Sequence, residues 1–169
     1  MKFFMMIFPV LGMLFAGCRN SSKMASAVNN FDVARYRGTW YEIARLPNWF
    51  QRGMYHASAE YTAMNDGSIK VVNRAIDAEG KLRSVTGTAK TVSSTGQGEL
   101  KVSFFKPFWS AYRVIYLTPD YSIAAVCGKS PDLLWILARR QELSPAELAP
   151  VIGFLKQRGF AVEKLLFVQ

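Results

Sequence analysis

Residue types that usually carry catalysis or bind metals are scarce in this chain. Its 169 residues include one histidine, His56, and two cysteines, Cys18 and Cys127. A zinc site needs three or four ligands, and a Cys–His dyad needs both side chains within hydrogen-bond reach. His56 and Cys127 fall on distant predicted strands, so neither site is expected. Because no Gly-rich phosphate loop or Gly-x-Ser-x-Gly turn occurs either, the sequence predicts no enzyme, no metal and no cofactor.

Cys18 follows a segment whose pattern indicates acylation. Residues 1–17 carry one charge, Lys2, followed by an apolar run and two small residues, which is the layout of an export signal. The run is shorter than the about 20 apolar residues that span a membrane. Small-small-Cys at its end resembles the lipobox of bacterial lipoproteins, in which Cys18 would be acylated and become the mature N-terminus. This family usually has Leu where Phe15 stands, so an ordinary secretory signal with an incidental cysteine is the alternative.

The resemblance to a lipobox implies a cellular location for the protein. A residue other than Asp after the cysteine, here Arg19, sends such proteins to the outer membrane, with the folded part in the periplasm. Two or more acyl chains give stable membrane attachment. Small and polar residues follow, which predicts a flexible tether. We therefore divide the chain into a signal peptide (1–17), a lipidated cysteine with its tether (18–30) and one domain (31–169).

The charge balance narrows the choice of partners. The chain has 21 Lys and Arg against 12 Asp and Glu, and removal of the signal takes away only Lys2. A basic periplasmic protein is attracted to anionic lipid head groups or acidic ligands. No nucleic-acid partner is expected, because the periplasm offers none and the basic residues form no stripe. With Cys18 acylated, Cys127 has no intrachain partner and is interpreted as a small buried apolar residue.

Short strands at regular spacing make up most of the domain, and they must position any functional site. Turn signals such as Asn65-Asp66-Gly67 separate runs of β-forming residues. Eight strands are predicted, at residues 39–46, 56–64, 69–76, 82–92, 99–105, 111–117, 122–128 and 133–139. Eight is the number at which a closed barrel is just wide enough to hold one small ligand. The predicted fold is therefore all-β, an eight-stranded antiparallel up-and-down barrel, and residues 164–168 could add a short ninth strand.

One helix is predicted after the strands. Ser144, Pro145 and Glu147 form a capping box with proline at the first helical position, and Gly159 ends the helix. Apolar residues recur at helical spacing on one face, at positions Leu148, Val151, Ile152 and Leu155. The helix should pack this face on the outside of the barrel.

Three short motifs resemble those of the lipocalins. Gly38-x-Trp40 lies at the first strand, Thr118-Pro119-Asp120-Tyr121 between the sixth and seventh, and Arg139 at the end of the eighth. Residues 101–108 and 126–128 are similar to the bacterial outer-membrane lipoprotein lipocalins. The resemblance implies that Arg139 stacks over Trp40 at the closed end. The structural-motif residues are thus scaffold rather than ligand contacts: Gly38, Trp40, Asp120, Tyr121 and Arg139.

Alternation along a strand places every second residue inside a barrel. The resemblance to the lipocalins decides which of the two sets of residues in each strand points inward. Many of the inward positions are Ala or Gly, which leaves volume unfilled and predicts a pocket; a barrel plugged by its own large residues is the alternative. The predicted ligand-binding residues are Ala59, Tyr61, Asn73, Ala89, Phe104, Tyr112, Tyr116 and Trp135. The other inward residues are predicted to be Trp40, Glu42, Ala44, Ala57, Val71, Val85, Gly87, Leu100, Val102, Val114, Ala125, Cys127 and Leu137.

An apolar pocket beside a membrane, on a basic protein, suits a fatty acid or a lysophospholipid. A haem or tetrapyrrole carrier that uses His56 as ligand stays open as another possibility. The mouth should lie near residues 47–54 and 106–109, with rim residues Trp49, Phe50, Arg52, Lys106, Phe108 and Trp109. These aromatic residues have a rival use: they could insert into the bilayer interface or into a second subunit, as a homodimer. The alternative function is thus a membrane-maintenance or interaction protein that acts through its rim.

Overall fold

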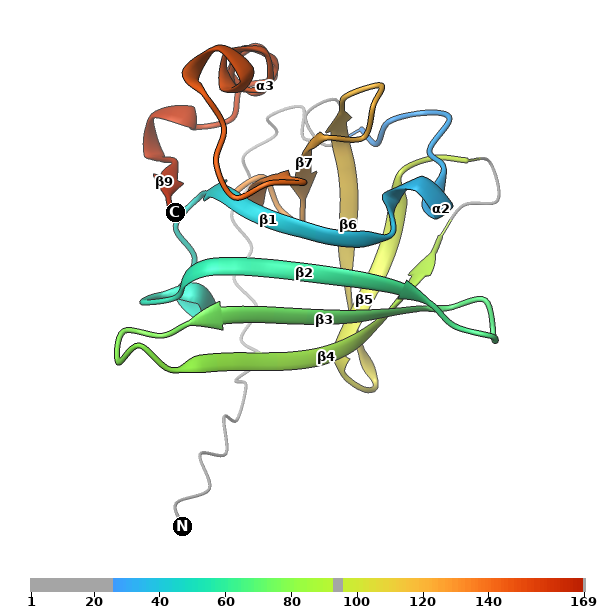
Figure 1. Cartoon of the computed structure of the whole chain (residues 1–169). Helices are drawn as coiled ribbons and strands as arrows, with labels where there is room; N and C mark the ends of the chain where they lie inside the picture. Colours follow the sequence, from blue (N-terminus) through green and yellow to red (C-terminus); the bar gives the residue numbers. More distant parts are fainter. Residues whose placement is uncertain (1–25, 93–95, 169) are drawn as a thin grey trace, which may run out of the picture.

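A computed structural model of the chain describes residues 26–92 and 96–168, and its main feature is one antiparallel sheet. Each strand pairs with the next, and β1 pairs with both β2 and β8, so the sheet closes into a barrel (Figure 1). The predicted fold class is confirmed. The strands are β1 (Gly38–Arg45), β2 (Tyr55–Ala63), β3 (Ile69–Ile76), β4 (Leu82–Thr91), β5 (Glu99–Phe105), β6 (Phe108–Leu117), β7 (Ile123–Cys127) and β8 (Leu134–Ala138). The short β9 (Leu166–Phe167) pairs with the end of β1.

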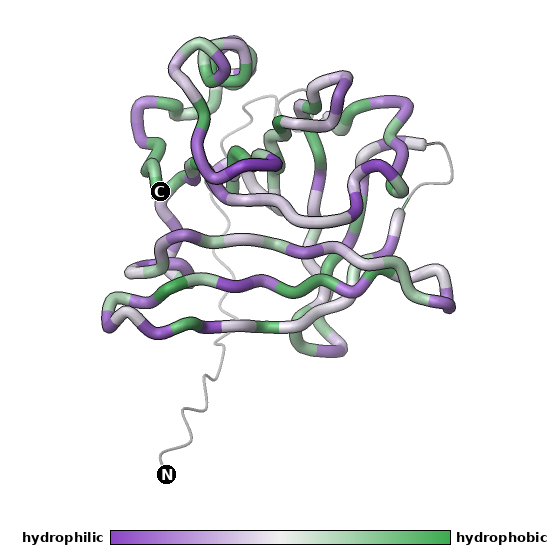
Figure 2. Tube along the Cα trace, viewed as in Figure 1, coloured by the Kyte–Doolittle hydropathy of each residue, from purple (hydrophilic) through white to green (hydrophobic). Residues whose placement is uncertain are grey.

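Local sequence explains where the strands stop. At the β2–β3 turn the Asp66 carboxylate accepts hydrogen bonds from the backbone N–H and the hydroxyl of Ser68, and Gly67 has a φ of 78°. Gly80, with a φ of 76°, has the same role after β3. Only a residue without Cβ adopts this conformation freely. Hydrophilic and hydrophobic segments alternate along β3 and β4 (Figure 2), as expected for strands with an inner and an outer face.

Two β-bulges change the predicted phase of the strands. One lies between Glu42 and Ala44 in β1, and the other between Val114 and Tyr116 in β6. A bulge adds one residue and turns every later side chain to the other face. Ala44 and Tyr116 therefore lie on the outer face of the barrel, so their predicted inward positions were wrong.

The phase of β7 was also predicted wrongly. Ala124 and Val126 face the barrel interior, whereas Ala125 and Cys127 lie outside in the layer under the C-terminal helix. All five residues of β7 are buried. Because both faces are covered, the strand has no hydropathy period from which its phase could be deduced.

The outer layer consists of α3 (Pro145–Gln157), which packs on the outside of the barrel as predicted. The Glu147 carboxylate accepts hydrogen bonds from the backbone N–H and the hydroxyl of Ser144, and Gly159 follows the helix with a φ of 83°. Val151 and Leu155 are fully buried against the barrel. Among the described residues, no helix is long and apolar enough to cross a membrane.

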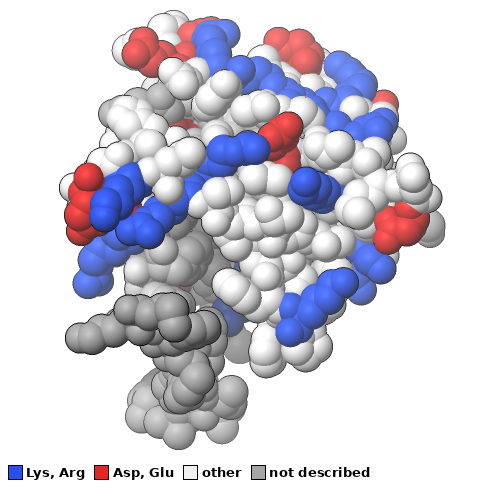
Figure 3. Space-filling view, turned by 60° about the horizontal axis from the view of Figure 1, so that its bottom comes forward, with Lys and Arg blue, Asp and Glu red and all other residues white. Residues whose placement is uncertain are grey.

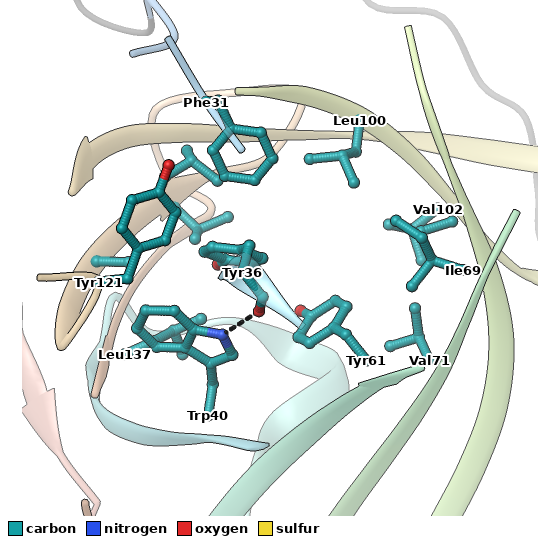
Figure 4. Packing of buried hydrophobic residues seen from close by; sticks show 14 residues of the cluster. Phe31, Tyr36, Trp40, Tyr61, Ile69, Val71, Leu100, Val102, Tyr121 and Leu137 are labelled. Atoms are coloured by element: carbon teal, nitrogen blue, oxygen red, sulfur yellow. Dashed lines mark hydrogen bonds between the residues drawn. The ribbon is translucent and has the colours of Figure 1, made fainter. Parts of the chain in front are cut away.

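A short helix that the sequence analysis did not predict, α2 (Val33–Tyr36), covers one end of the barrel. The indole N–H of Trp40 donates to the backbone oxygen of Tyr36 over 2.8 Å (Figure 4). The guanidinium of Arg139 lies 4.0 Å from the centre of a Trp40 ring and donates to the backbone oxygens of Thr39 and Arg35. Gly38, the first residue of β1, has a φ of 92°, which only a residue without Cβ adopts freely. This is the closed end.

The segment before α2 is attached to the closed end. The Val28 N–H donates to the backbone oxygen of Val114, and the Gly98 N–H donates to that of Val28. The Phe31 N–H donates to the backbone oxygen of Gly96. The predicted tether therefore ends before residue 28 instead of at residue 30. Cys18 and residues 1–17 lie outside the described residues, so their predicted processing stays a prediction.

Candidate ligand-binding site

The barrel interior is packed at the closed end and open to solvent at the other. Near the closed end, Trp40, Val71 and Leu100 are almost fully buried. Further along the same inner face, the exposure of the side chains increases. Ala59, Asn73, Phe104, Tyr112 and Trp135 are all only partly buried. Solvent therefore reaches the interior from the open end, which is formed by the β1–β2, β3–β4, β5–β6 and β7–β8 connections.

Seven of the eight predicted ligand-binding residues face this interior. Ala59, Tyr61, Ala89, Phe104, Tyr112 and Trp135 belong to the interior cluster or pack against it. Asn73 pairs with Ala59 and Val85 and lies two residues from the buried Val71 on β3, which places it on the same face. Tyr116 is the exception, because its ring packs 5.2 Å from that of Phe154 on α3. That these seven residues contact a ligand stays a prediction.

Three tyrosine hydroxyls meet inside the barrel, and the sequence analysis had identified two of them. Tyr61 donates to the Tyr112 hydroxyl over 2.8 Å, and the Tyr36 hydroxyl lies 2.7 Å from that of Tyr112. Burial raises the pKa of Tyr61 to about 12 and the pKa values of Tyr36 and Tyr112 well above 10. All three hydroxyls are therefore neutral hydrogen-bonding groups at physiological pH. Tyr36 was missed because it lies on the unpredicted α2.

The amide of Asn73 lies on the same inner face as this tyrosine cluster. Its Oδ1 atom is buried and has no hydrogen-bond partner among the described residues. A buried amide oxygen without a partner is costly. The Ser103 hydroxyl on β5 is buried without a partner among the described residues as well.

Gly87 shows how part of the interior is filled. A Cβ atom at this position would lie 2.6 Å from Cδ1 of Phe104 and 2.7 Å from the backbone oxygen of Ser103. The Phe104 ring therefore lies against the β4 backbone. The missing side chain of Gly87 makes space for this ring and not for a ligand, which corrects the prediction that each small inward residue adds to the cavity.

An ion pair fixes the β1–β2 loop at the open end. The Arg45 guanidinium lies 2.6 Å from the Glu42 carboxylate, and both side chains are buried. Arg45 also donates to the backbone oxygens of Gln51 and Met54. The Gln51 side chain donates to Glu42 and accepts from the indole N–H of Trp135, each over 2.8 Å. The short helix η1 (Trp49–Gln51) is thus held against the barrel interior, and the pair neutralises its own charges.

The predicted rim residues lie at the open end and are exposed. Trp49 and Phe50 stand on η1, and Phe108 and Trp109 begin β6, which starts earlier than predicted. Phe105, 73% exposed, was missed although it directly precedes Lys106 at the β5–β6 turn. Figure 3 shows one face of the molecule, in which a broad area of uncharged residues is bordered by Lys and Arg and also by some Asp and Glu side chains.

Other exposed apolar residues join the rim. Tyr55 at the start of β2, Leu82 at the start of β4, and Leu166 and Phe167 on β9 are exposed at this end. A groove of about 470 Å³ runs beside η1 and is lined by residues that include Arg52, Trp49, Tyr55 and Phe167. A smaller hollow of about 240 Å³ lies beside Trp109, Lys101 and Arg113.

The residues that could bind a metal or act in catalysis lie apart from one another. His56 is exposed at the start of β2, and its backbone N–H donates to the backbone oxygen of Val168. Cys127 is buried under α3, where burial raises the pKa of its thiol to about 11. Among the residues that the structure describes, no group of three His, Cys, Asp or Glu side chains could hold a metal ion.

Comparison with known proteins agrees with this geometry. Residues 31–169 match the family of lipocalin-like domains. The chain belongs to the lipocalin family. The chain is 40% identical over 148 residues to the outer membrane lipoprotein Blc of Citrobacter freundii, covering 87% of this lipocalin and 84% of that protein. It is 39% identical over 166 residues to the Vibrio cholerae protein of the same name, covering 96% and 97%.

The solved structures show the same fold. Insecticyanin from Manduca sexta superposes with a TM-score of 0.72 and 23% identity, over 86% of this lipocalin and 84% of that chain. The predicted resemblance to outer-membrane lipoprotein lipocalins is confirmed by the Blc relatives. Their name also confirms the predicted class and address of this lipocalin, a lipid-anchored protein of the outer membrane.

Proposed function

We propose that this lipocalin binds a fatty acid or a lysophospholipid in its barrel and stores or carries it at the outer membrane. The observation that carries the proposal is the interior itself. It is apolar and buried at the closed end, partly exposed toward the mouth, and lined by small and aromatic side chains. The Blc relatives and the lipocalin-like match support a lipid-binding lipoprotein rather than an enzyme.

The wall chemistry favours an acyl chain. Burial of a sixteen-carbon chain contributes at most about 12 kcal/mol, at about 0.8 kcal/mol for each methylene. Association and chain ordering cost about 4 kcal/mol or more. The remainder, at most about 8 kcal/mol, corresponds to micromolar binding without special contacts.

The mouth offers cations for a charged head group. Arg52 lines the groove beside η1, and Lys106 lies at the exposed β5–β6 turn between aromatic residues. The buried Arg45 is paired with Glu42. A carboxylate or phosphate would therefore stay at the mouth, because an unpaired charge in the apolar interior is strongly unfavourable.

Native mass spectrometry with lipid extraction tests the proposal on a soluble form that begins near Ala25. We expect co-purified fatty acid or lysophospholipid, at one ligand for each barrel or each dimer. The same spectra report whether the protein is a homodimer. An empty protein that also fails to bind added oleate and lysophospholipid would contradict the carrier function.

The exposed rim favours a second candidate function, association with a lipid surface. Most large exposed apolar side chains among the described residues lie at the open end; Met64, Val85 and Val92 are the exceptions. Aromatic residues beside Lys and Arg are typical of protein segments that contact the membrane interface. Such a protein would act through its rim, with no specific ligand in the barrel.

Vesicle flotation distinguishes this candidate. Phe105→Ser combined with Phe108→Ser should lower binding to vesicles of phosphatidylethanolamine and phosphatidylglycerol. Val92→Ser, at the closed end and 59% exposed, is the matched control and should bind as the wild type does. Equal binding by all three proteins would exclude a role of the β5–β6 turn in membrane association.

A further inference from the structure

The tyrosine cluster has one hydrogen-bond donor left over. Three hydroxyls, those of Tyr36, Tyr61 and Tyr112, are joined by two hydrogen bonds, and each bond uses one hydroxyl hydrogen. Whichever of Tyr36 and Tyr112 donates to the other, one hydrogen of the cluster has no acceptor among the described residues. Tyr36 and Tyr61 are buried, whereas Tyr112 is only partly buried and is the member of the cluster that extends toward the partly exposed part of the interior.

Asn73 adds an acceptor to this donor. Its buried Oδ1 atom has no partner among the described residues. The residue stands next to Ala59 on β2, one inner layer nearer the mouth than Tyr61, which pairs with Val71. Successive inner layers of a strand are two residues apart, about 7 Å along the chain. The same length of buried acyl chain would pass both groups.

A plain hydrocarbon chain does not suit these two groups. Among the described residues, the amide oxygen of Asn73 has no donor, and one hydroxyl hydrogen of the cluster has no acceptor. A methylene chain beside these groups supplies neither, so it leaves both of them unpaired in the buried interior, which is costly. A carboxylate does not suit these two groups either, because a buried negative charge needs a cation beside it. Arg45, on the inner face near the mouth, is already paired with Glu42.

We infer that the barrel selects an acyl ligand that carries a hydroxyl group in its buried part. A hydroxyl group both donates and accepts: it donates to Oδ1 of Asn73, and it accepts from the tyrosine cluster. The charged head group stays at the mouth, where Lys106 and Arg52 lie. This inference rests on the proposed function, because it names the class of acyl lipid that the same cavity prefers.

Competition binding on the mature protein tests the inference. Stearic acid and hydroxystearic acids with the hydroxyl at successive positions along the chain compete for the barrel against a fluorescent fatty acid, cis-parinaric acid. At least one hydroxylated isomer should bind about tenfold more tightly than stearic acid, which corresponds to about 1.4 kcal/mol. The preferred position reports the depth of Asn73 and Tyr112 below the mouth.

Variants locate the effect. Asn73→Leu and Tyr112→Phe should each reduce the preference for the hydroxylated acid at least threefold, while stearic acid binds as well as before or better. Tyr116→Phe is the matched control, since it lies on the same strand with its ring outside the barrel. Thermal unfolding of each variant checks that it folds.

Each result has one meaning. If no hydroxylated isomer binds better than stearic acid, or if the preference survives in both interior variants, the inference is wrong and the acyl carrier function stands. If cis-parinaric acid itself does not bind to the protein, the proposed function fails as well.

Discussion

Replacement of Ala59 by Phe is expected to block the barrel without unfolding it. Ala59 lies on the inner face of β2, pairs with Trp40 on β1 and Asn73 on β3, and is only partly buried. The layer below it, toward the closed end, contains the almost fully buried Tyr61. A phenyl ring at position 59 would therefore point into the partly exposed interior one layer above the tyrosine cluster, where we propose that an acyl chain passes.

The size of the effect follows from the volume that the ring takes. A phenyl ring displaces about five methylenes of a bound chain, which removes about 4 kcal/mol of burial free energy. This difference corresponds to about a thousandfold weaker binding. Where the interior is hollow, the added ring leaves the melting temperature unchanged or raises it, whereas overpacking of a filled interior would cost about 1–3 kcal/mol.

Titration with a fluorescent fatty acid and thermal unfolding together check this prediction. Ser58→Phe is the control, because Ser58 precedes Ala59 on β2 and points to the outer face opposite Arg74. The control should bind like the wild type. An Ala59→Phe protein that is folded and still binds within threefold of the wild type would refute the reasoning, since the acyl chain would then lie elsewhere.

Three further predictions concern the scaffold. Of the seven tyrosines, three should ionise late in an ultraviolet difference titration, because the pKa of Tyr61 is about 12 and those of its two neighbours are also raised. Tyrosine side chains in the unfolded chain ionise near pH 10.0. The contribution of these three tyrosines to the free energy of unfolding is therefore complete below that pH and is lost as the pH rises toward 12. Tyr112→Phe should make this loss smaller. Cys127, with its raised thiol pKa, should react with a disulfide reagent at mildly alkaline pH only when urea unfolds the domain; rapid labelling of the native protein would contradict its burial under α3. Arg139→Lys should lower the free energy of unfolding by about 2 kcal/mol in urea titrations, through the loss of the planar stacking on Trp40 and of hydrogen bonds to backbone oxygens.

Elements with a local signal were predictable. The strand bounds differ from the predicted ones by three residues at most, and the Ser144 capping box and Gly159 delimit α3 as expected. Of the interior, Ala59, Tyr61 and Asn73 were placed correctly because β2 and β3 alternate regularly in this part of the barrel. The order of the motifs was enough to predict the family.

Elements without a local signal were missed. Tyr116 and Ala44 changed faces at bulges, which have no sequence signature of their own. Cys127 was misplaced because helix α3 buries the outer face of β7. Tyr36 was overlooked because α2 has four residues, too few to show a helical period.

By itself, the sequence determined the class of this protein: the alternation of its strands, the turns between them and the short motifs require a closed barrel, and each is a property of neighbouring residues. The tertiary structure decided which side chains share the cavity. Tyr36, Tyr61 and Tyr112 come from one helix and two strands far apart in the chain, and their hydroxyls meet only when the barrel closes. Whether a buried hydroxyl or amide lacks a hydrogen-bond partner depends on groups that the whole fold brings close to it. The hydrogen-bonding chemistry of the barrel interior therefore follows only from the closed structure.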